Sequence, residues 1–296
     1  MKRLLLAVGV VSLGTVFSAC AGTPSKSNGK PTVAVAFYPI EEIVRRVGGS
    51  EVNVVELVPP GQEPHEYEPT AQQFADLEQA DIVFYLGSNF QPNLQKAIES
   101  LPSSVQAIDL LEPLSLRAVA DGIDPHVWLD PRNMDTMATY VADILGRLLP
   151  ESADTFGRNV GEYHVDLFTL YGDLALGLRD CAVPILITTH EAFGYFAFAF
   201  GLTQIAIAGI SPGDEPSAKQ LETIAALAAD NNVTTVFFEE NLPADLAATV
   251  ADEIGAATSS LATAETLTQD QLDAGESYLS LMRSNLLALR AGLSCP

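Results

Sequence analysis

Apolar and polar positions alternate with two periods from residue 31 onward. Short apolar, β-branched runs of the kind that form buried strands are separated by stretches with the three- and four-residue spacing of amphipathic helices. The first runs are residues 32–37, 52–58, 81–86 and 105–108, with helical patterns at 40–47, 71–80 and 91–100. A second set of runs follows at 185–189, 204–208, 234–238 and 256–261. This alternation predicts an α/β fold with two parallel-sheet lobes.

The segment between the two sets, residues 151–179, has the pattern of one helix. It contains no proline, and its apolar residues form a single stripe: Phe156, Val160, Tyr163, Leu167, Leu170, Leu174 and Leu178. A continuous helix of this length would be about 40 Å long at 1.5 Å per residue. We therefore predict an N-terminal α/β lobe over 31–150, a stiff linking helix over 151–179 and a C-terminal α/β lobe over 180–296.

The first thirty residues have a different character. Two basic residues precede an uncharged, mostly apolar run that ends at Cys20, which is typical of an export signal over 1–20 and is short for a membrane span of about 20 residues. The tetrapeptide FSAC resembles a bacterial lipobox, although Phe17 stands where leucine is usual. Residues 21–30 have the composition of a flexible tether. We expect lipidation at Cys20 and an extracytoplasmic protein, anchored by lipid at the cell surface or in the periplasm; plain secretion and a retained anchor are the alternatives.

Export changes the interpretation of the other cysteines. With Cys20 lipidated, Cys181 and Cys295 remain as an even pair in an oxidising compartment. A disulfide between them would close a loop of about 115 residues. We expect this disulfide, with two free buried thiols as the alternative.

Composition narrows the possible partners. The 296-residue chain is 48% hydrophobic, enough for a substantial core, and carries a formal net charge of −23. A nucleic-acid partner requires a basic face that neutralises phosphates, so we exclude one. An acidic surface attracts cations only weakly, since salt screens the attraction beyond about 10 Å, and we interpret the charge as serving solubility.

At least two of three histidines, His65, His126 and His190, lie where parallel sheets bind ligands. His65 follows the second strand-like run, His190 directly follows the fifth, and His126 stands in DGIDPHVWLDP. In open α/β sheets ligands bind outside the carboxyl ends of the strands, so a cleft between the lobes could bring all three together. Imidazole suits zinc and would leave one tetrahedral position to fill. His164, in the linking helix, is interpreted as a surface or packing residue, and unconnected histidines remain the alternative for the other three.

Six stretches of the chain, in order, resemble the solute-binding lipoproteins of bacterial zinc and manganese ABC importers. They are PHEYEPTAQQFADLEQADIVFYLG, DPHVWLDPRNMDTMA, THEAFGYFAFAFGL, GISPGDEPSAKQL, VFFEENLP and SYLSLMRSNLLAL. The resemblance runs from about residue 31 to 293 and implies two α/β lobes bridged by one long rigid helix, with a metal site between the lobes. It also implies a monomeric receptor, not an enzyme, that delivers a metal ion to the membrane permease of an ABC importer.

The resemblance also implies three metal ligands. His65 matches the histidine of the family's PH-x-Y-E-P stretch, His126 that of DPH-x-W, and His190 the third ligand. Manganese receptors of the family carry a carboxylate at the third position, so His190 favours Zn²⁺ as the transported ion over Mn²⁺. Many zinc members have a long histidine-rich loop, which residues 109–125 lack. Its absence weakens any claim of a metal-collecting loop, but it does not weaken the claim of the metal site itself.

At the fourth ligand the sequence departs from the family. Relatives place an aspartate at about Ala262, whose side chain cannot bind metal. Glu265, three residues further on, is the candidate there. Water, Glu63 and Glu66 are the alternatives.

Three other functions remain open from the sequence. A zinc hydrolase would also use three ligands and an open position, with Glu66 or Glu191 as general base, but no nucleophile motif accompanies them. A metal-binding surface adhesin would use the same lipid anchor. A manganese receptor of the same family is the third, and competition between the two metals distinguishes it from a zinc receptor.

Overall fold

The structure is a computed structural model that describes residues 29–120, 122–240 and 244–296. The expected signal segment with Cys20, and most of the expected tether, lie outside the described residues. Residues Pro31–Pro296 form one unit of structure. In the described part of the chain, no helix combines the length and the apolar character needed to cross a membrane.

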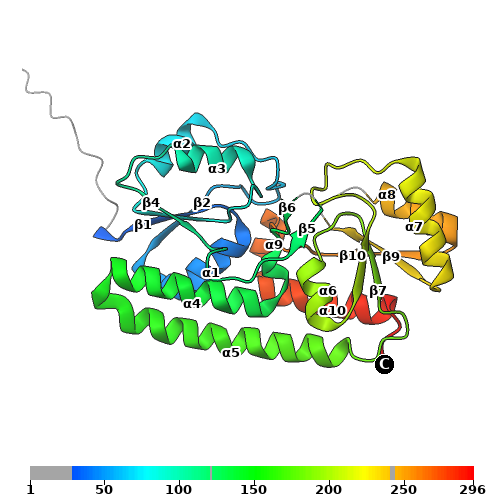
Figure 1. Cartoon of the computed structure of the whole chain (residues 1–296). Coiled ribbons are helices and arrows are strands. Elements are labelled where there is room, and N and C mark those ends of the chain that lie inside the picture. Colours follow the sequence, from blue (N-terminus) through cyan, green and yellow to red (C-terminus); the bar gives the residue numbers. More distant parts are fainter. Residues whose placement is uncertain (1–28, 121, 241–243) are drawn as a thin grey trace, which may run out of the picture. The chain divides into compact units, whose positions relative to one another are not determined.

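The first lobe is built on a sheet of four parallel strands in the order β2-β1-β3-β4. Its two central strands are rich in buried Val, Ile, Ala and Phe, which suit a strand covered on both faces. The strands are β1 (Thr32–Val35), β2 (Asn53–Glu56), β3 (Ile82–Tyr85) and β4 (Gln106–Asp109). Helices α2 (Ala71–Leu77) and α3 (Pro92–Glu99) lie on one side, with α1 (Tyr38–Gly48) and α4 (Pro131–Leu148) on the other (Figure 1).

The second lobe repeats this plan with the strand order β10-β9-β7-β8, again all parallel. Ile187 at its centre lies opposite Ile205 on one side and Val236 on the other. The strands are β7 (Ile185–Thr188), β8 (Thr203–Ala206), β9 (Thr235–Glu239) and β10 (Ala257–Leu261). The helices are α6 (Gly194–Phe200), α7 (Ala218–Asp230), α8 (Asp245–Ile254), α9 (Gln269–Asp273) and α10 (Tyr278–Gly292).

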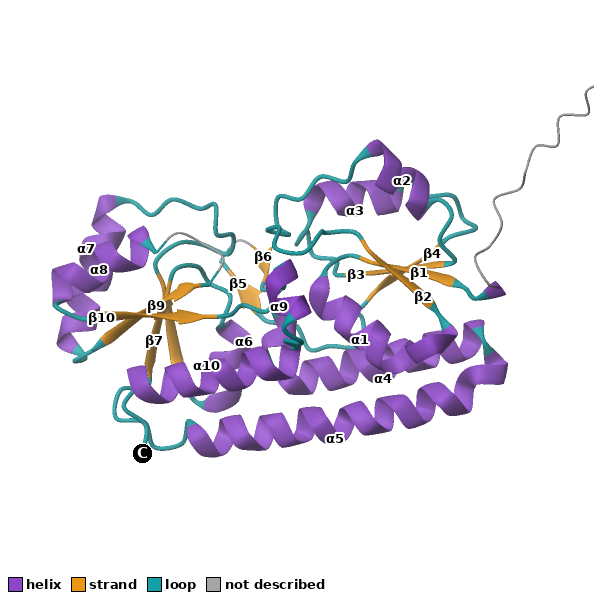
Figure 2. Ribbon diagram, turned by 180° about the vertical axis from the view of Figure 1, so that it is seen from behind, coloured by secondary structure: helices purple, strands orange, loops and turns teal. Residues whose placement is uncertain are grey.

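One long helix, α5 (Ala153–Gly177), connects the lobes. It starts after a short 3₁₀ turn, η4 (Pro150–Ser152), and packs against α1 and α4 of the first lobe and α10 of the second (Figures 1 and 2). Its buried face consists of Phe156, Tyr163, Leu167, Leu170 and Leu174. These residues belong to one apolar core that also includes residues of both lobes. The predicted fold of two parallel-sheet lobes bridged by a long helix is confirmed.

Several short elements were not predicted. Strands β5 (Ala118–Val119) and β6 (Gly122–Ile123) form an antiparallel pair, and 3₁₀ helices occur at η2 (Gly49–Glu51) and η3 (Val127–Leu129). Elements of two or three residues are too short to show a period. Beside this pair, the backbone N–H of Arg117 donates to the Tyr195 hydroxyl at 2.8 Å, and the Arg117 guanidinium lies over the Tyr195 ring. The antiparallel pair is therefore held against α6 of the second lobe.

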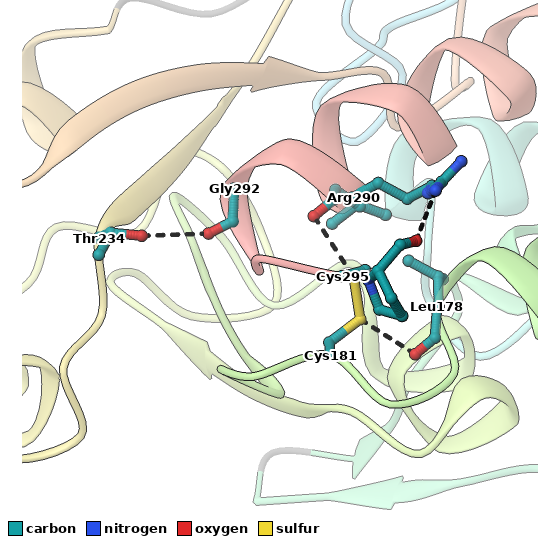
Figure 3. Close-up of a disulfide and its surroundings, with 8 residues drawn as sticks. Leu178, Cys181, Thr234, Arg290, Gly292 and Cys295 are labelled. Atoms are coloured by element: carbon teal, nitrogen blue, oxygen red, sulfur yellow. Dashed lines mark hydrogen bonds between the residues drawn. A yellow bond between two sulfur atoms is a disulfide. The ribbon is translucent and has the colours of Figure 1, made fainter.

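A disulfide between Cys181 and Cys295 attaches the C-terminal residues to the start of the second lobe (Figure 3). Backbone hydrogen bonds support it, because the N–H of Ala182 donates to Ser294 O at 3.2 Å and that of Val183 to Leu293 O at 3.1 Å. The two cysteines are 114 positions apart in the sequence. The end of α10 is thus tied to the segment that leads into β7.

Candidate metal centre

His65 lies in the loop after β2, and the residue two positions earlier orients its ring. The backbone N–H of His65 donates to Glu63 Oε1 at 2.9 Å, and the ring Nδ1 is hydrogen-bonded to the same oxygen. An ionised carboxylate can only accept, so the ring carries its proton on Nδ1 and leaves the lone pair of Nε2 free. Pro64, between the two, has no N–H that could compete for the carboxylate.

His126 repeats this arrangement in a second acid-Pro-His triplet. Its backbone N–H and its ring Nδ1 both lie 3.0 Å from Asp124 Oδ1. The other oxygen of Asp124 lies 3.9 Å from Arg117 Nε, which links the triplet to the β5–β6 pair. His126 is completely buried, and its Nε2 is again the nitrogen left free.

His190 follows β7 and obtains its carboxylate from the neighbouring strand. Glu239, the last residue of β9, places Oε1 2.7 Å from His190 Nδ1 and accepts the His190 backbone N–H at 3.3 Å. The hydroxyl of Thr189 donates to the same carboxylate oxygen. A carboxylate against Nδ1 fixes the tautomer and orientation of a metal-binding histidine, so all three rings present Nε2.

Glu265 reaches the same point from the loop after β10. Asn285 of α10 holds the start of this loop, because its side chain accepts from the Ala262 N–H at 2.8 Å and donates to the Ala262 carbonyl at 2.7 Å. Ala264 then adopts a left-handed conformation with φ 54°, which is unusual for a residue other than glycine. This turn directs the carboxylate of Glu265, which is 6% exposed, into the site.

The four side chains bring their ligand atoms within 4.8 Å of one another. The Nε2 atoms of His65 and His126 are 3.3 Å apart, and those of His126 and His190 are 3.4 Å apart. Glu265 Oε1 lies 3.7 Å from His126 Nε2 and 3.8 Å from His190 Nε2. Zinc held at about 2.0–2.1 Å in a tetrahedron separates its ligands by about 3.3–3.4 Å. The two imidazole pairs therefore already match a tetrahedral zinc ion, and the carboxylate of Glu265 lies slightly further out.

Burial and neighbouring charges shift the pKa values of three of these groups. Burial, together with the neighbouring His190 and His65, holds the pKa of His126 well below its usual value, so the ring is neutral at physiological pH. Burial also lowers the pKa of His190, but contact with Glu239 and the charge of Glu265 outweigh burial and raise it. Burial raises the pKa of Glu265, and its Oε1 has no hydrogen-bond partner among the described residues. A metal ion would satisfy that oxygen.

Aromatic side chains form the wall of the site in the first lobe. Phe90 lies edge-on to His65 with ring centroids 4.6 Å apart, and Trp128 lies 5.3 Å from the His126 ring. Phe90 and Trp128 contact each other at 5.4 Å. These rings restrict the imidazoles to one orientation and exclude water from this side.

Several candidates from the sequence lie outside the four-atom cluster. Glu63 is occupied with the ring and backbone of His65, and Glu66 is exposed. Glu191 is only partly buried and is not a member of the cluster. His164 lies on the surface of α5, where its Nδ1 is 2.9 Å from Asp135 Oδ1, in agreement with its interpretation as a surface residue.

Comparison with known proteins identifies the family. The family described as "Zinc-uptake complex component A periplasmic" matches residues 33–292. The chain belongs to this zinc-uptake family. The expected resemblance is therefore confirmed over both lobes and the linking helix.

Individual members of the zinc-uptake family show the same extent of similarity. The zinc-binding lipoprotein AdcA of Streptococcus pneumoniae (strain ATCC BAA-255 / R6) is 33% identical over 306 residues, which cover 98% of this chain and 61% of AdcA. The chain thus spans less than two thirds of the length of that relative. The high-affinity zinc uptake system protein ZnuA of Bacillus subtilis (strain 168) is 31% identical over 295 residues, covering 93% of this chain and 92% of ZnuA.

A solved structure supports the same assignment. The crystal structure of the Zn(II)-bound ZnuA-like domain of Streptococcus pneumoniae AdcA matches with a TM-score of 0.79 and 35% sequence identity. The match covers 90% of this chain and 99% of that domain. The two-lobed architecture is therefore that of a zinc-uptake family member.

The carboxylates behind the three rings were not predicted from the sequence. Two of them had a visible signal, since Glu63 and Asp124 each precede a histidine by two positions with a proline between. Glu239 had no such signal, because it is 49 positions from His190 and only the pairing of β7 with β9 brings the two together.

Proposed function

We propose that this member of the zinc-uptake family captures Zn²⁺ outside the cytoplasm and delivers it to the membrane permease of an ABC importer. The observation that carries the proposal is the set of four ligand atoms, three imidazole Nε2 and one carboxylate oxygen, that lie within 4.8 Å of one another. Two of the Nε2 pairs already have the separation of tetrahedral zinc ligands. A set rich in nitrogen favours zinc over manganese, which prefers oxygen ligands. His65, His126, His190 and Glu265 are the proposed ligands.

The fourth ligand position of the site supports a receptor that carries out no catalysis. A catalytic zinc keeps one position for water or substrate. Here Glu265 Oε1 occupies the fourth corner of the cluster, and the four side chains are buried. We expect zinc-loaded protein to hydrolyse neither ester nor peptide substrates, and turnover abolished by His190→Ala would contradict this role.

Release of the ion requires only limited movement of the lobes in this proposal. Helix α5 packs against elements of both lobes, and one apolar core continues across them. Opening the lobes widely would expose that core. Small-angle scattering of metal-free and zinc-loaded protein should therefore give nearly equal radii of gyration, and a change typical of wide hinge opening would count against the proposal.

The anchor and the permease are part of the same proposal. Lipidation of Cys20 would keep the receptor at the membrane that contains the permease. A deletion strain should lose growth at low zinc and recover it with excess zinc, and a Cys20→Ser chain should be released from the membrane. Loss of surface adhesion with normal growth at low zinc would favour the adhesin alternative.

Trp128, the only tryptophan of the chain, offers a direct test of the metal preference. Its ring lies 5.3 Å from that of His126, so metal binding should change its fluorescence. Zn²⁺ should bind more tightly than Mn²⁺, and His190→Asp should narrow that difference by introducing an oxygen ligand. His164→Ala is the matched control, since His164 is the one histidine outside the cluster and should leave both affinities unchanged. A parent chain that prefers Mn²⁺ would overturn the assignment.

A further inference from the structure

The outward side of α5 carries an apolar face that is largely exposed. In both views the helix lies along one edge, with its neighbours on one side only (Figures 1 and 2). Val165, Phe168 and Leu176 on this side are 61%, 71% and 69% exposed. Large apolar side chains exposed together on one helix face indicate an interaction surface.

Glycines continue the same face. Gly157, Gly161 and Gly172 lie within α5, and a Cβ added to any of them would meet nothing within 4 Å. Nothing within the described chain therefore requires the absence of a side chain there. Glycine also destabilises a helix interior more than any residue except proline. Gly157 and Gly161 are exposed and Gly172 is half-buried, and glycines at these positions are explained if another helix approaches closely.

The glycines and the large apolar residues of this face are spaced regularly along α5. The face consists of two sets of three positions, and each position of the second set lies 11 residues after one of the first: Gly157 and Phe168, Gly161 and Gly172, Val165 and Leu176. An 11-residue repeat keeps a face nearly aligned along a helix, with a slight right-handed drift. The face, from Gly157 to Leu176, is about 29 Å long at 1.5 Å per residue.

The face is also complementary to itself in the antiparallel direction. Rotation about the point between residues 166 and 167 places Gly157 of one copy opposite Leu176 of the other. The same rotation places Gly161 opposite Gly172, and Val165 opposite Phe168. A leucine or phenylalanine from each copy would fill the space beside a glycine or a smaller residue of its partner.

Charges at the two ends of the face fit the same pairing. Asp154, in the first turn of α5, and Arg179, just after the last, are symmetric about the same point. Both are exposed, and the Arg179 Nε lies 3.2 Å from the adjacent Asp180. In an antiparallel pair each Asp154 faces an Arg179 of the other copy, at both ends. A two-fold interface of this kind uses the same surface on both subunits.

We propose that α5 is a homodimer interface, in which the helices of two copies pack antiparallel through the face from Gly157 to Leu176. The sequence predicts a monomer, whereas this face supports a dimer of two identical chains. An interface formed mainly by two helices is smaller than the roughly 1,600 Å² of a standard complex, so the dimer should be a weak one. The metal centre lies away from α5 and remains free for exchange with a permease.

Sedimentation velocity of the full chain, purified in a mild detergent, tests the proposal. Between about 1 and 200 µM the parent should pass from monomer to dimer mass. Gly161→Leu should abolish dimerisation, while its melting temperature stays at or above that of the parent because leucine is the better helix former. Thr223→Leu on α7 adds the same side chain to an exposed site elsewhere and should dimerise like the parent.

Exchanging the charges of Asp154 and Arg179 tests whether these residues meet across the dimer or only change the stability of their own helix. Asp154→Arg and Arg179→Asp should each weaken the dimer about tenfold by placing like charges together. The double variant restores opposite charges between the copies, although each charge then opposes the helix dipole, and it should dimerise like the parent. A parent that stays monomeric up to about 200 µM, or a dimer that Gly161→Leu and the single charge variants leave intact, would overturn the proposal.

Discussion

The hydroxyl of Tyr278 donates a hydrogen bond to the backbone carbonyl of Trp128 at 2.7 Å, across 150 positions of sequence. Tyr278 begins α10, and Trp128 lies in the 3₁₀ turn directly after His126. The indole N–H of Trp128 in turn donates to the carbonyl of Thr263, in the loop that carries Glu265. The last helix, the turn of His126 and the loop of Glu265 are therefore connected by two hydrogen bonds, one buried and one partly buried.

Loss of this hydroxyl should destabilise the fold. Tyr278 and Trp128 are completely buried, so Tyr278→Phe leaves a carbonyl without its partner, at a cost of about 1–3 kcal/mol. Thermal unfolding followed by circular dichroism should show a lower melting temperature, by roughly 2–4 °C for each kcal/mol of stability lost. Tyr140→Phe is the control, because it removes a hydroxyl whose hydrogen bond to Glu112 is at the surface. Equal melting temperatures for the two variants would mean that the buried bond contributes little.

Removal of the Glu265 carboxylate should weaken zinc binding. Glu265→Gln keeps the shape of the side chain but removes the negative charge that faces the three Nε2 atoms. We expect a loss of affinity of about tenfold or more, since even outer partners of metal ligands contribute 10–100-fold. Isothermal titration in competition with a chelator measures it.

Glu240→Gln is the matched control for Glu265. Glu240 directly follows the end of β9, but its carboxylate is at the surface, where Gln271 donates to it at 3.3 Å. This variant should bind zinc like the parent. If Glu265→Gln also binds like the parent, water rather than the carboxylate completes the tetrahedron.

Glu56 should make the stability of the first lobe depend on pH. Burial, and then the charge of Glu41, raise the pKa of Glu56 to about 8, and Arg45 offsets this only in part. An acid whose pKa is raised in the folded state contributes stability below its unfolded pKa, near 4.5, and loses that contribution as the pH rises through about 8. Glu56→Gln has no charge to bury, so it should be more stable than the parent at about pH 9, by roughly 1–2 kcal/mol.

Urea unfolding at about pH 5 and about pH 9 measures the effect of Glu56. The increase in the free energy of unfolding caused by Glu56→Gln should be largest at the higher pH and nearly absent at the lower. Glu253→Gln, at an exposed position of α8, is the control and should show no such dependence. A gain that is the same at both pH values would mean that Glu56 is ionised in the folded chain throughout.

Loss of the Cys181–Cys295 disulfide should lower the melting temperature without removing the metal centre. The bridge spans 114 positions, and a native disulfide typically contributes about 2–4 kcal/mol. Reduction, or replacement of both cysteines by serine, should therefore lower the melting temperature by roughly 5–15 °C. Zinc affinity at about 25 °C should stay close to that of the parent, because no member of the metal cluster contacts the bridge. Two alkylatable thiols in freshly exported protein would refute the bridge.

The sequence predicted the two lobes because each strand is short, apolar and separated from the next by a helical period. Prediction was less accurate at the ends of elements, as for β2, expected over 52–58 and found at Asn53–Glu56. Residues next to a strand often have the same apolar pattern and extended backbone, although they make no hydrogen bonds to a neighbouring strand. The sequence alone therefore does not distinguish them from the strand. Likewise, the expected helix 151–179 loses its first two residues to η4, since Pro150 begins a separate 3₁₀ turn there.

The three histidines followed from their motifs, but the position of Glu265 could not. The family pattern pointed to Ala262, and the carboxylate three residues later enters the site because Asn285 holds Ala262 from a distant helix. The left-handed conformation of Ala264 also has no signal in the sequence, since glycine or asparagine would be expected there. Tertiary contacts, not local preference, place this carboxylate in the cluster.

The position of α10 in the chain has a consequence for the order in which the protein matures. A chain that leaves the cytoplasm N-terminus first delivers His65, His126 and His190 well before residues 278–296. Until those residues arrive, Tyr278 does not yet hold the turn of His126, and Asn285 does not yet hold the loop of Glu265. For a receptor exported as proposed, we therefore expect a nascent chain to expose three histidines without the geometry that retains an ion, and tight loading to begin only when translocation is complete.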